Sequence, residues 1–305
     1  MDEVLLSARG LIRYYGKQQI LHGIDLELHR GEVLGLLGLN GAGKSTTMQI
    51  LTGALHADAG EVHISGHSLR AMPLVAKRHL GYLPENAPLN ADMLVDEFLD
   101  ACARLRGVGV DALSAAVDRA RRRCGLGDVG KRLIGHLSKG YQQRVGIAQA
   151  IVHEPSVIVF DEPTSGLDPL QIRDVRALIR ELGRTCAVLV STHILPEVQL
   201  LADRILILHG GRIVHDAPLT SGKQWVRARF RHAPAHGALA SLPGAENIRG
   251  NADDGWLIQT PDGDAFACSL AEHAVSNGWG LIELKPGYDE LEERFAEITS
   301  GVNAR

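Results

Sequence analysis

Residues 38–46 have the sequence Gly38-Leu39-Asn40-Gly41-Ala42-Gly43-Lys44-Ser45-Thr46, which fits the spacing G-x-x-x-x-G-K-[ST]. Glycines at this spacing let the backbone wrap around a phosphate with its N–H groups pointing inward, through dihedral angles that a side chain would forbid. Lys44 then supplies a positive charge for the β- and γ-phosphates of ATP, and the Ser45 hydroxyl is a ligand for Mg²⁺. The segment predicts a nucleotide phosphate site made of Gly38, Asn40, Gly41, Gly43, Lys44, Ser45 and Thr46.

The sequence on either side of this loop supports the same interpretation. Residues 32–37 predict a buried strand that leads into the loop, and residues 46–51 predict a helix that leaves it. The positive end of that helix dipole would face the bound anion. The bare pattern occurs by chance in roughly one chain of this length in a hundred, so the strand–loop–helix context and the later motifs carry the argument.

Two acidic residues follow a run of apolar residues further along the chain. Val157–Phe160 predict a buried parallel strand, and Asp161 and Glu162 come directly after it. Ligands of open parallel sheets bind at the carboxyl ends of the strands. Asp161 is therefore expected to reach Mg²⁺ through a water, and Glu162 to orient or deprotonate the water that attacks the γ-phosphate. Taken alone, the same residues are also compatible with a solvated turn.

Three further motifs complete an ordered set. Leu137-Ser138-Lys139-Gly140-Tyr141 precedes the acidic pair, and Ser165-Gly166-Leu167-Asp168 and His193 follow it. Over residues 3–216 the set resembles the ATPase subunit of an ATP-binding-cassette (ABC) transporter. The resemblance implies an α/β fold: a P-loop NTPase core of ABC cassette type with an antiparallel β subdomain, an inserted helical subdomain and a small α+β C-terminal domain. It also implies two cassettes, as a homodimer or heterodimer, packed head to tail with each ATP between the phosphate loop of one and the signature of the other.

The resemblance also assigns roles to residues outside the phosphate loop. Tyr15 matches the aromatic that stacks on adenine, Ser138 and Gly140 match the signature donors that meet the partner's γ-phosphate, Asp168 matches the D-loop aspartate, and His193 matches the switch histidine that contacts the γ-phosphate. Three of these have a structural alternative. Tyr15 is also compatible with an ordinary strand aromatic, and Ser138 and Asp168 with N-caps of helices.

Two positions depart from the family pattern. The signature usually has the sequence Leu-Ser-Gly-Gly-Gln, whereas Lys139 and Tyr141 stand here in place of one of its glycines and of its glutamine. Glu85 stands where the family most often has a glutamine that senses Mg²⁺ and the attacking water. We expect Glu85 to take that role as a Mg²⁺ ligand; the alternative is that it points to solvent and Asn86 or a water does the sensing.

The composition excludes several classes of protein. The chain has 305 residues with 45% hydrophobic side chains, 32 basic and 36 acidic side chains, so no positive excess favours nucleic acid as a partner. No secretory signal and no apolar stretch of the roughly 20 residues that a membrane helix needs are visible. We therefore expect a cytoplasmic chain. The resemblance further implies that it is peripheral on the cytoplasmic face of the plasma membrane, bound to separate integral-membrane permease subunits. The four cysteines are expected to be small core residues and the 14 histidines to be incidental, because neither has metal-ligand spacing.

The pattern of turns and apolar residues predicts two domains. Residues 1–218 form the nucleotide-binding domain, with a helical subdomain at about residues 92–153, and residues 219–305 form a small α+β accessory domain. Helices are expected at 92–106, 111–124 and 138–153. Leu105 belongs to the apolar face of the first helix, and the arginines of the second indicate a solvated face more than a binding patch. In the accessory domain we expect strands at 225–230, 256–260 and 281–285, a turn at 261–263, and a final helix bearing Leu291, Phe295 and Ile298.

These observations together predict an ATP-binding and ATP-hydrolysing subunit that powers translocation, of export type, through separate permeases. The export-type branch includes drug-resistance, gliding-motility-related and copper-enzyme-maturation cassettes. An alternative is a soluble cassette that acts on ribosomes or nucleic acid. A degenerate regulatory cassette is disfavoured because Lys44, Asp161, Glu162 and His193 are all present.

Overall fold

The computed structural model describes residues 3–219, 224–252, 255–288 and 295. The chain divides into two compact units, Met1–Leu219 and Thr220–Arg305, which are described separately below. The domain boundary expected from the sequence lies one residue before this division.

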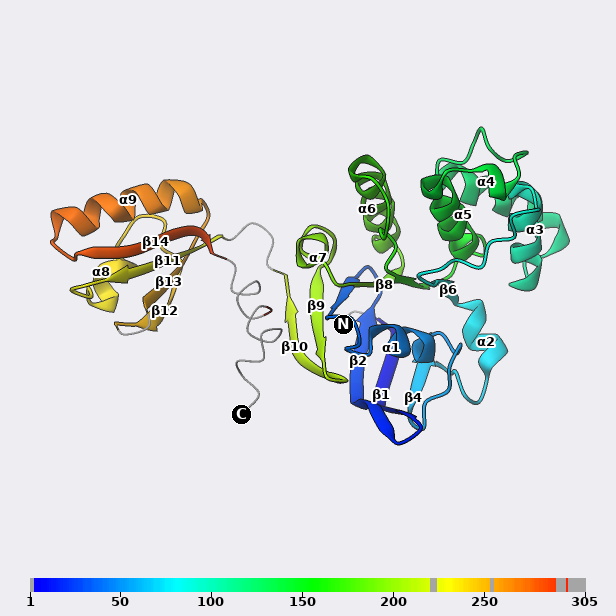
Figure 1. Cartoon of the computed structure of the whole chain (residues 1–305), viewed down its shortest axis with the longest axis horizontal. Coiled ribbons are helices and arrows are strands. Elements are labelled where there is room, and N and C mark those ends of the chain that lie inside the picture. Colours follow the sequence, from blue (N-terminus) through cyan, green and yellow to red (C-terminus); the bar gives the residue numbers. More distant parts are fainter. Residues whose placement is uncertain (1–2, 220–223, 253–254, 289–294, 296–305) are drawn as a thin grey trace. The chain divides into compact units, whose positions relative to one another are not determined.

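The centre of unit 1 is a six-stranded sheet that is parallel except at one edge (Figure 1). Its strand order is β10-β9-β3-β8-β7-β6, with β3 at Val33–Leu37, β6 at Leu80–Leu83, β7 at Val157–Asp161, β8 at Ala187–Thr192, β9 at Arg204–His209 and β10 at Arg212–Pro218. Every residue of β3, β7 and β8 is buried. Continuous apolar runs of this kind are expected for parallel strands covered on both faces, and the segments that leave β3, β6, β7 and β8 emerge at one edge of the sheet.

A second, antiparallel sheet lies at the N-terminal end of the chain. Its strand order is β2-β1-β4-β5, with β1 at Val4–Tyr15, β2 at Gln18–His29, β4 at Ala59–Ile64 and β5 at His67–Ser68. Buried leucines of β1 and β2 share one core cluster with Met48 of α1 (Lys44–Leu51) and with residues of the parallel sheet. The two sheets therefore pack around one hydrophobic core.

The remaining helices of unit 1 are α2 (Pro73–Arg78), α3 (Val95–Leu105), α4 (Leu113–Arg123), α5 (Lys139–Ile151), α6 (Pro169–Gly183) and α7 (Leu195–Leu201), with short 3₁₀ turns at Val110–Ala112 and Ile134–His136. The helices α3, α4 and α5 pack against one another (Figure 1). Leu105 was expected on the apolar face of α3, but it is 87% exposed. The reason is that α3 ends at Leu105 and no neighbouring element covers its last residue.

Three of the four arginines of α4 form ion pairs with acids on other elements. Arg119 pairs with Glu154 at 2.9 Å, Arg121 with Asp96 at 2.8 Å, and Arg123 with Glu181 at 3.0 Å. These contacts hold α4 to its surroundings. The prediction that all four cysteines lie in the core is correct only for Cys124, because Cys102 and Cys186 are half-buried and Cys268 lies on the exposed side of its helix.

Unit 2 has the β-α-β-β-α-β order of a ferredoxin-like fold. The elements are β11 (Gln224–Phe230), α8 (His236–Ala240), β12 (Asn247–Asn251), β13 (Gly255–Thr260), α9 (Gly263–Ser276) and β14 (Leu281–Tyr288), and the antiparallel sheet has the order β12-β13-β11-β14. Leu239, Phe266 and Leu270 of the two helices share a core cluster with residues of β11 and β13. The sequence interpretation placed only a turn at 261–263 and missed α9, whose N-cap is Asp262. The helix expected around Leu291 and Ile298 lies, apart from Phe295, outside the described residues.

Candidate nucleotide site

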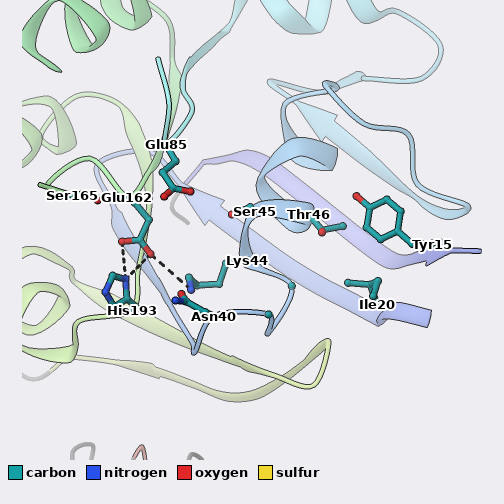
Figure 2. Close-up of a pocket in the computed structure, with 12 residues that line it drawn as sticks. Tyr15, Ile20, Asn40, Lys44, Ser45, Thr46, Glu85, Glu162, Ser165 and His193 are labelled. Carbon is teal, nitrogen blue, oxygen red and sulfur yellow. Dashed lines mark hydrogen bonds and ion pairs between the residues drawn. The ribbon is translucent and has the colours of Figure 1, made fainter. Parts of the chain in front are cut away.

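A cavity of about 370 Å³ opens beside the loop that joins β3 to α1 (Figure 2). Its lining residues come from β1, β2, the loop itself, the start of α1 and the segments that follow β6, β7 and β8. They are Tyr15, Ile20, Asn40, Gly41, Gly43, Lys44, Ser45, Thr46, Glu85, Glu162, Ser165 and His193. The fold thus gathers most of the site residues predicted from the sequence around one space.

Two glycines of the loop are required by its geometry. A Cβ on Gly38 would lie 2.4 Å from the backbone oxygen of Leu208, so no side chain fits there. Gly43, the N-cap of α1, has a φ of 106°, which L side chains rarely adopt. Gly38 does not line the cavity, but its carbonyl oxygen accepts a hydrogen bond from Lys44. The loop conformation therefore depends on both positions.

Lys44 is almost completely buried at the base of the cavity. Its Nζ donates to the carbonyl oxygens of Gly38 at 2.8 Å and Leu39 at 3.3 Å, and lies 3.8 Å from Oε1 of Glu162. Burial lowers the pKa of the Lys44 ammonium, and the carboxylates of Glu162, Asp161 and Glu85 oppose that shift. Lys44 is thus a buried cation whose neighbours are carboxylates and loop carbonyls. A phosphate that takes the place of some of these neighbours would still stabilise the charged ammonium.

Glu162 and His193 contact each other across the ends of β7 and β8. Nδ1 of His193 lies 3.0 Å from both carboxylate oxygens of Glu162 (Figure 2). The backbone N–H of Glu162 donates to Oγ of Ser191 at 3.1 Å and to the carbonyl oxygen of Ser191 at 3.2 Å. The Glu162 carboxylate is thus held in the cavity between an imidazole and the Lys44 ammonium.

Asp161 lies behind the cavity lining. It is 3% exposed, and Oδ1 accepts a hydrogen bond of 2.5 Å from the Ser191 hydroxyl. Ser45 and Glu85 do line the cavity, and both offer oxygen ligands of the kind that Mg²⁺ prefers. The donor set therefore fits Mg²⁺ at the cavity wall, with Asp161 set back from it. Glu85 contributes to this lining and is itself exposed, so its role as a Mg²⁺ ligand stays a prediction.

Ser138, Gly140 and Asp168 do not line the cavity. Ser138 is the N-cap of α5, where Oγ accepts from the backbone N–H of Tyr141 at 3.4 Å. Asp168 is the N-cap of α6 and accepts from the N–H groups of Leu170 at 3.0 Å and Gln171 at 2.9 Å. Within one chain Ser138 and Asp168 thus have the capping roles that the sequence left open as alternatives.

The sequence interpretation missed two lining residues, Ile20 and Ser165. Ser165 follows Glu162 closely in a motif that was recognised, so its place in that loop was a usable signal. Ile20 gave no signal, because only the pairing of β1 with β2 brings it to the cavity near Tyr15. Tyr15 itself is 49% exposed, and its ring centroid lies 5.2 Å from the guanidinium carbon of Arg13.

Comparison with known proteins agrees with this geometry. Residues 21–165 match the ABC transporter family model. The chain is 32% identical over 303 residues to an uncharacterised ABC transporter ATP-binding protein, YdbJ of Bacillus subtilis (strain 168), covering 98% of this chain and 97% of the relative. The chain belongs to the ABC transporter ATP-binding proteins. The bacitracin transport ATP-binding protein BcrA of Bacillus licheniformis is 29% identical over 302 residues, covering 97% of this chain and 98% of that protein.

Solved ABC cassettes have the same fold as unit 1. The structure of an ATP-binding subunit of an ABC transporter is 32% identical, with a TM-score of 0.65, and the match covers 70% of this chain and 90% of that one. This ABC cassette is an ATP-binding and ATP-hydrolysing subunit of a transporter, and the expected α/β P-loop fold of cassette type is confirmed. Its relatives give no support to the alternative of a ribosome or nucleic-acid ATPase. In the described part of the cassette, no helix has the length and apolar character to span a bilayer.

Proposed function

We propose that two copies of this cassette enclose two ATP molecules, each held by the cavity of one copy and the signature of the other. The observation that supports this is the division of the motif residues. Most of them line one cavity, whereas Ser138, Gly140 and Asp168 do not. A second copy placed head to tail would bring its Ser138 and Gly140 to the open side of the cavity, as is usual in the family.

Within one copy, we assign the nucleotide contacts by chemistry. The ring of Tyr15 stacks on adenine, and the backbone N–H groups of the loop from Gly38 to Gly43, with Thr46, surround the phosphates. Lys44 neutralises the β- and γ-phosphates. Ser45 and Glu85 would hold Mg²⁺, with Asp161 acting through a water, and the ion would supply charge neutralisation for the phosphates and the departing ADP.

Glu162 and His193 are the groups nearest the hydrolytic chemistry in this proposal. Glu162 accepts the proton of the water that attacks the γ-phosphorus, and ADP leaves as the bond to the γ-phosphoryl group breaks. His193 orients the Glu162 carboxylate through the 3.0 Å contact and donates to the γ-phosphate. The Lys44 ammonium lies 3.8 Å from the same carboxylate, so a phosphate drawn to Lys44 arrives beside the base.

The transport role extends the same proposal. The cassette binds integral-membrane permease subunits on the cytoplasmic face of the plasma membrane and drives export through them. The similarity to the bacitracin transport ATP-binding protein spans both units of the chain, which supports this assignment.

A complementation experiment tests the shared site. Lys44→Ala removes the phosphate cation, and Gly140→Asp places a carboxylate at the signature. Gly140 lies in the first turn of α5, where an acidic residue suits the helix dipole. A Cβ there would lie 2.4 Å from the end of the flexible Gln171 side chain, which has to move aside, so circular dichroism must first check that this variant is folded. We expect each variant alone to hydrolyse ATP poorly.

In an equimolar mixture of the two variants, about half of the dimers contain one of each. Each mixed dimer then has one site with both defects and one intact site, so the mixture should recover about a quarter of the wild-type ATPase rate. A site made within one chain would always contain a defect. No recovery above the sum of the separate rates would therefore refute the shared site.

A further inference from the structure

A buried carboxylate lies just behind the nucleotide cavity. Glu197, in the first turn of α7, is 8% exposed and does not line the cavity. Its Oε2 accepts hydrogen bonds from the hydroxyls of Thr164 at 2.8 Å and Thr192 at 3.3 Å, and its Oε1 lies 3.4 Å from Nη2 of Arg176 on α6. One side chain thus contacts three separate segments of the chain.

The two threonines are close in sequence to the two groups assigned to hydrolysis. Thr164 is two residues after Glu162, and Thr192 directly precedes His193. Both threonines are buried, at 6% and 2% exposure. Glu197 therefore links the loop after β7 to the end of β8. The same two segments also meet through the 3.0 Å contact between Glu162 and His193 (Figure 2).

The helix that carries Glu197 is firmly seated. Gly35 of β3 has no side chain, and a Cβ there would fall 2.4 Å from Cγ1 of Val198, so α7 packs directly on the strand. The Arg180 guanidinium on α6 donates to the carbonyl oxygen of Leu200 at 2.6 and 2.9 Å. Glu197 thus belongs to a rigid support rather than to a surface turn.

We propose that Glu197 is a positioning residue for ATP hydrolysis: by holding Thr164 and Thr192 together it sets the contact between Glu162 and His193. Through Arg176 it also ties that contact to α6, the helix that begins after Asp168. Small displacements of catalytic groups cost rate more than binding, because orientation matters in the transition state. The inference rests on the roles proposed above for Glu162 and His193. Because Glu197, the two threonines, Glu162 and His193 all belong to one chain, it is independent of how two copies assemble.

Steady-state ATP hydrolysis by the full-length chain tests this role. Glu197→Gln keeps the size of the side chain but removes its charge, and puts an amide donor opposite a threonine hydroxyl or Arg176. We expect kcat to fall about tenfold while KM for ATP stays within about twofold, because every cavity-lining side chain is retained. Thr164→Val removes the hydrogen bond to Glu197 with little change of shape and should lower kcat in the same way. Thr192→Val should do so too, although it also removes the acceptor of the Ile194 backbone N–H at 3.1 Å.

A double-mutant cycle separates positioning from general stability. If Glu197 acts through Thr164, Glu197→Gln should have little further effect on kcat in a Thr164→Val background. Thr185→Val is the matched control and should leave both constants unchanged. This exposed threonine lies two residues before β8 begins, whereas Thr192 is the last residue of that strand. Additive losses, a rise in KM that accounts for the change, or unaltered kcat in folded Thr164→Val and Thr192→Val variants would each overturn the proposal.

Discussion

Glu162 has a backbone conformation that few side chains adopt. Its φ of 50° lies in the left-handed region, where residues other than glycine, asparagine and aspartate are uncommon. Such a conformation costs on the order of 1 kcal/mol or more and persists only when the surroundings hold it. Here the two hydrogen bonds from the Glu162 N–H to Ser191 hold it, and the carboxylate consequently turns towards Lys44 and His193.

At the scale of single residues, the reactive groups of the site could be predicted better than the residues that hold them in place. Lys44, Ser45, Glu162 and His193 stand in motifs whose order and spacing indicate phosphate chemistry. Ile20 and Glu197 have no such local signal, because neighbouring strands and buried hydrogen bonds place them. Sequence spacing carries no information about which buried hydroxyl meets which carboxylate.

His153 provides a test of stability against pH. Burial, and then the nearby Arg106 charge, lowers the pKa of His153 from 6.5 to about 4. Its Nε2 bonds to the carbonyl oxygen of Leu80 at 3.0 Å, and Nδ1 has no partner among the described residues. Since the folded-state pKa is the lower one, the unfolded chain binds the proton first. Stability from this group is complete above about pH 6.5 and is lost as pH falls towards 4.

We expect this loss to amount to roughly 3 kcal/mol, at about 1.4 kcal/mol for each unit of pKa. Urea unfolding of unit 1, followed by circular dichroism at pH 7 and pH 4.5, measures it. The variant His153→Gln should lose less stability than the wild type over this range, whereas the control His136→Gln, at an exposed histidine, should behave like the wild type. Equal losses in all three proteins would contradict the assigned role of His153.

Among the elements, α9 shows where sequence patterns fail. Pro261, Asp262 and Gly263 favour a turn, and only a turn was predicted there, but Asp262 is the N-cap of a helix of 14 residues that begins at Gly263. A turn and a helix N-terminus use the same residue types, because both need a side-chain acceptor for backbone N–H groups. The apolar run Val157–Phe160 of β7 had no such ambiguity, which explains why that strand was predicted.

The cap of α9 can be tested directly. Oδ1 of Asp262 accepts from the backbone N–H of Ala265 at 3.0 Å. We expect Asp262→Ala to destabilise unit 2 by about 1 kcal/mol, and Asp262→Asn, which retains a capping oxygen, to have much less effect. Tryptophan fluorescence during urea unfolding is a selective probe, because all three tryptophans, Trp225, Trp256 and Trp279, lie in unit 2. A loss as large for asparagine as for alanine would show that the cap is not the cause.

At the scale of the whole molecule, the residues of the nucleotide cavity all lie in unit 1. The last lining residue in the sequence is His193, well before the division at residue 219. Unit 1 also has its own core cluster, which includes no residue of unit 2. We propose that unit 2 is not needed for nucleotide binding.

A chain ending at residue 219 should therefore fold and bind ATP with an affinity within about threefold of the full-length protein. Isothermal titration calorimetry measures the affinity, and circular dichroism checks that the shortened protein is folded. A folded protein of residues 1–219 that no longer binds ATP would show that unit 2 contributes to the site.

The division between the units also bears on how such a protein can evolve. The main chain crosses from one unit to the other once, between residues 219 and 220, and each sheet takes its strands from a single unit. A single recombination point in the gene at this junction would therefore exchange the entire ferredoxin-like unit without cutting any ladder of hydrogen bonds. Such an exchange would retain the nucleotide site of unit 1 while unit 2 is replaced. The parts of the gene that encode the two units can therefore have separate evolutionary origins.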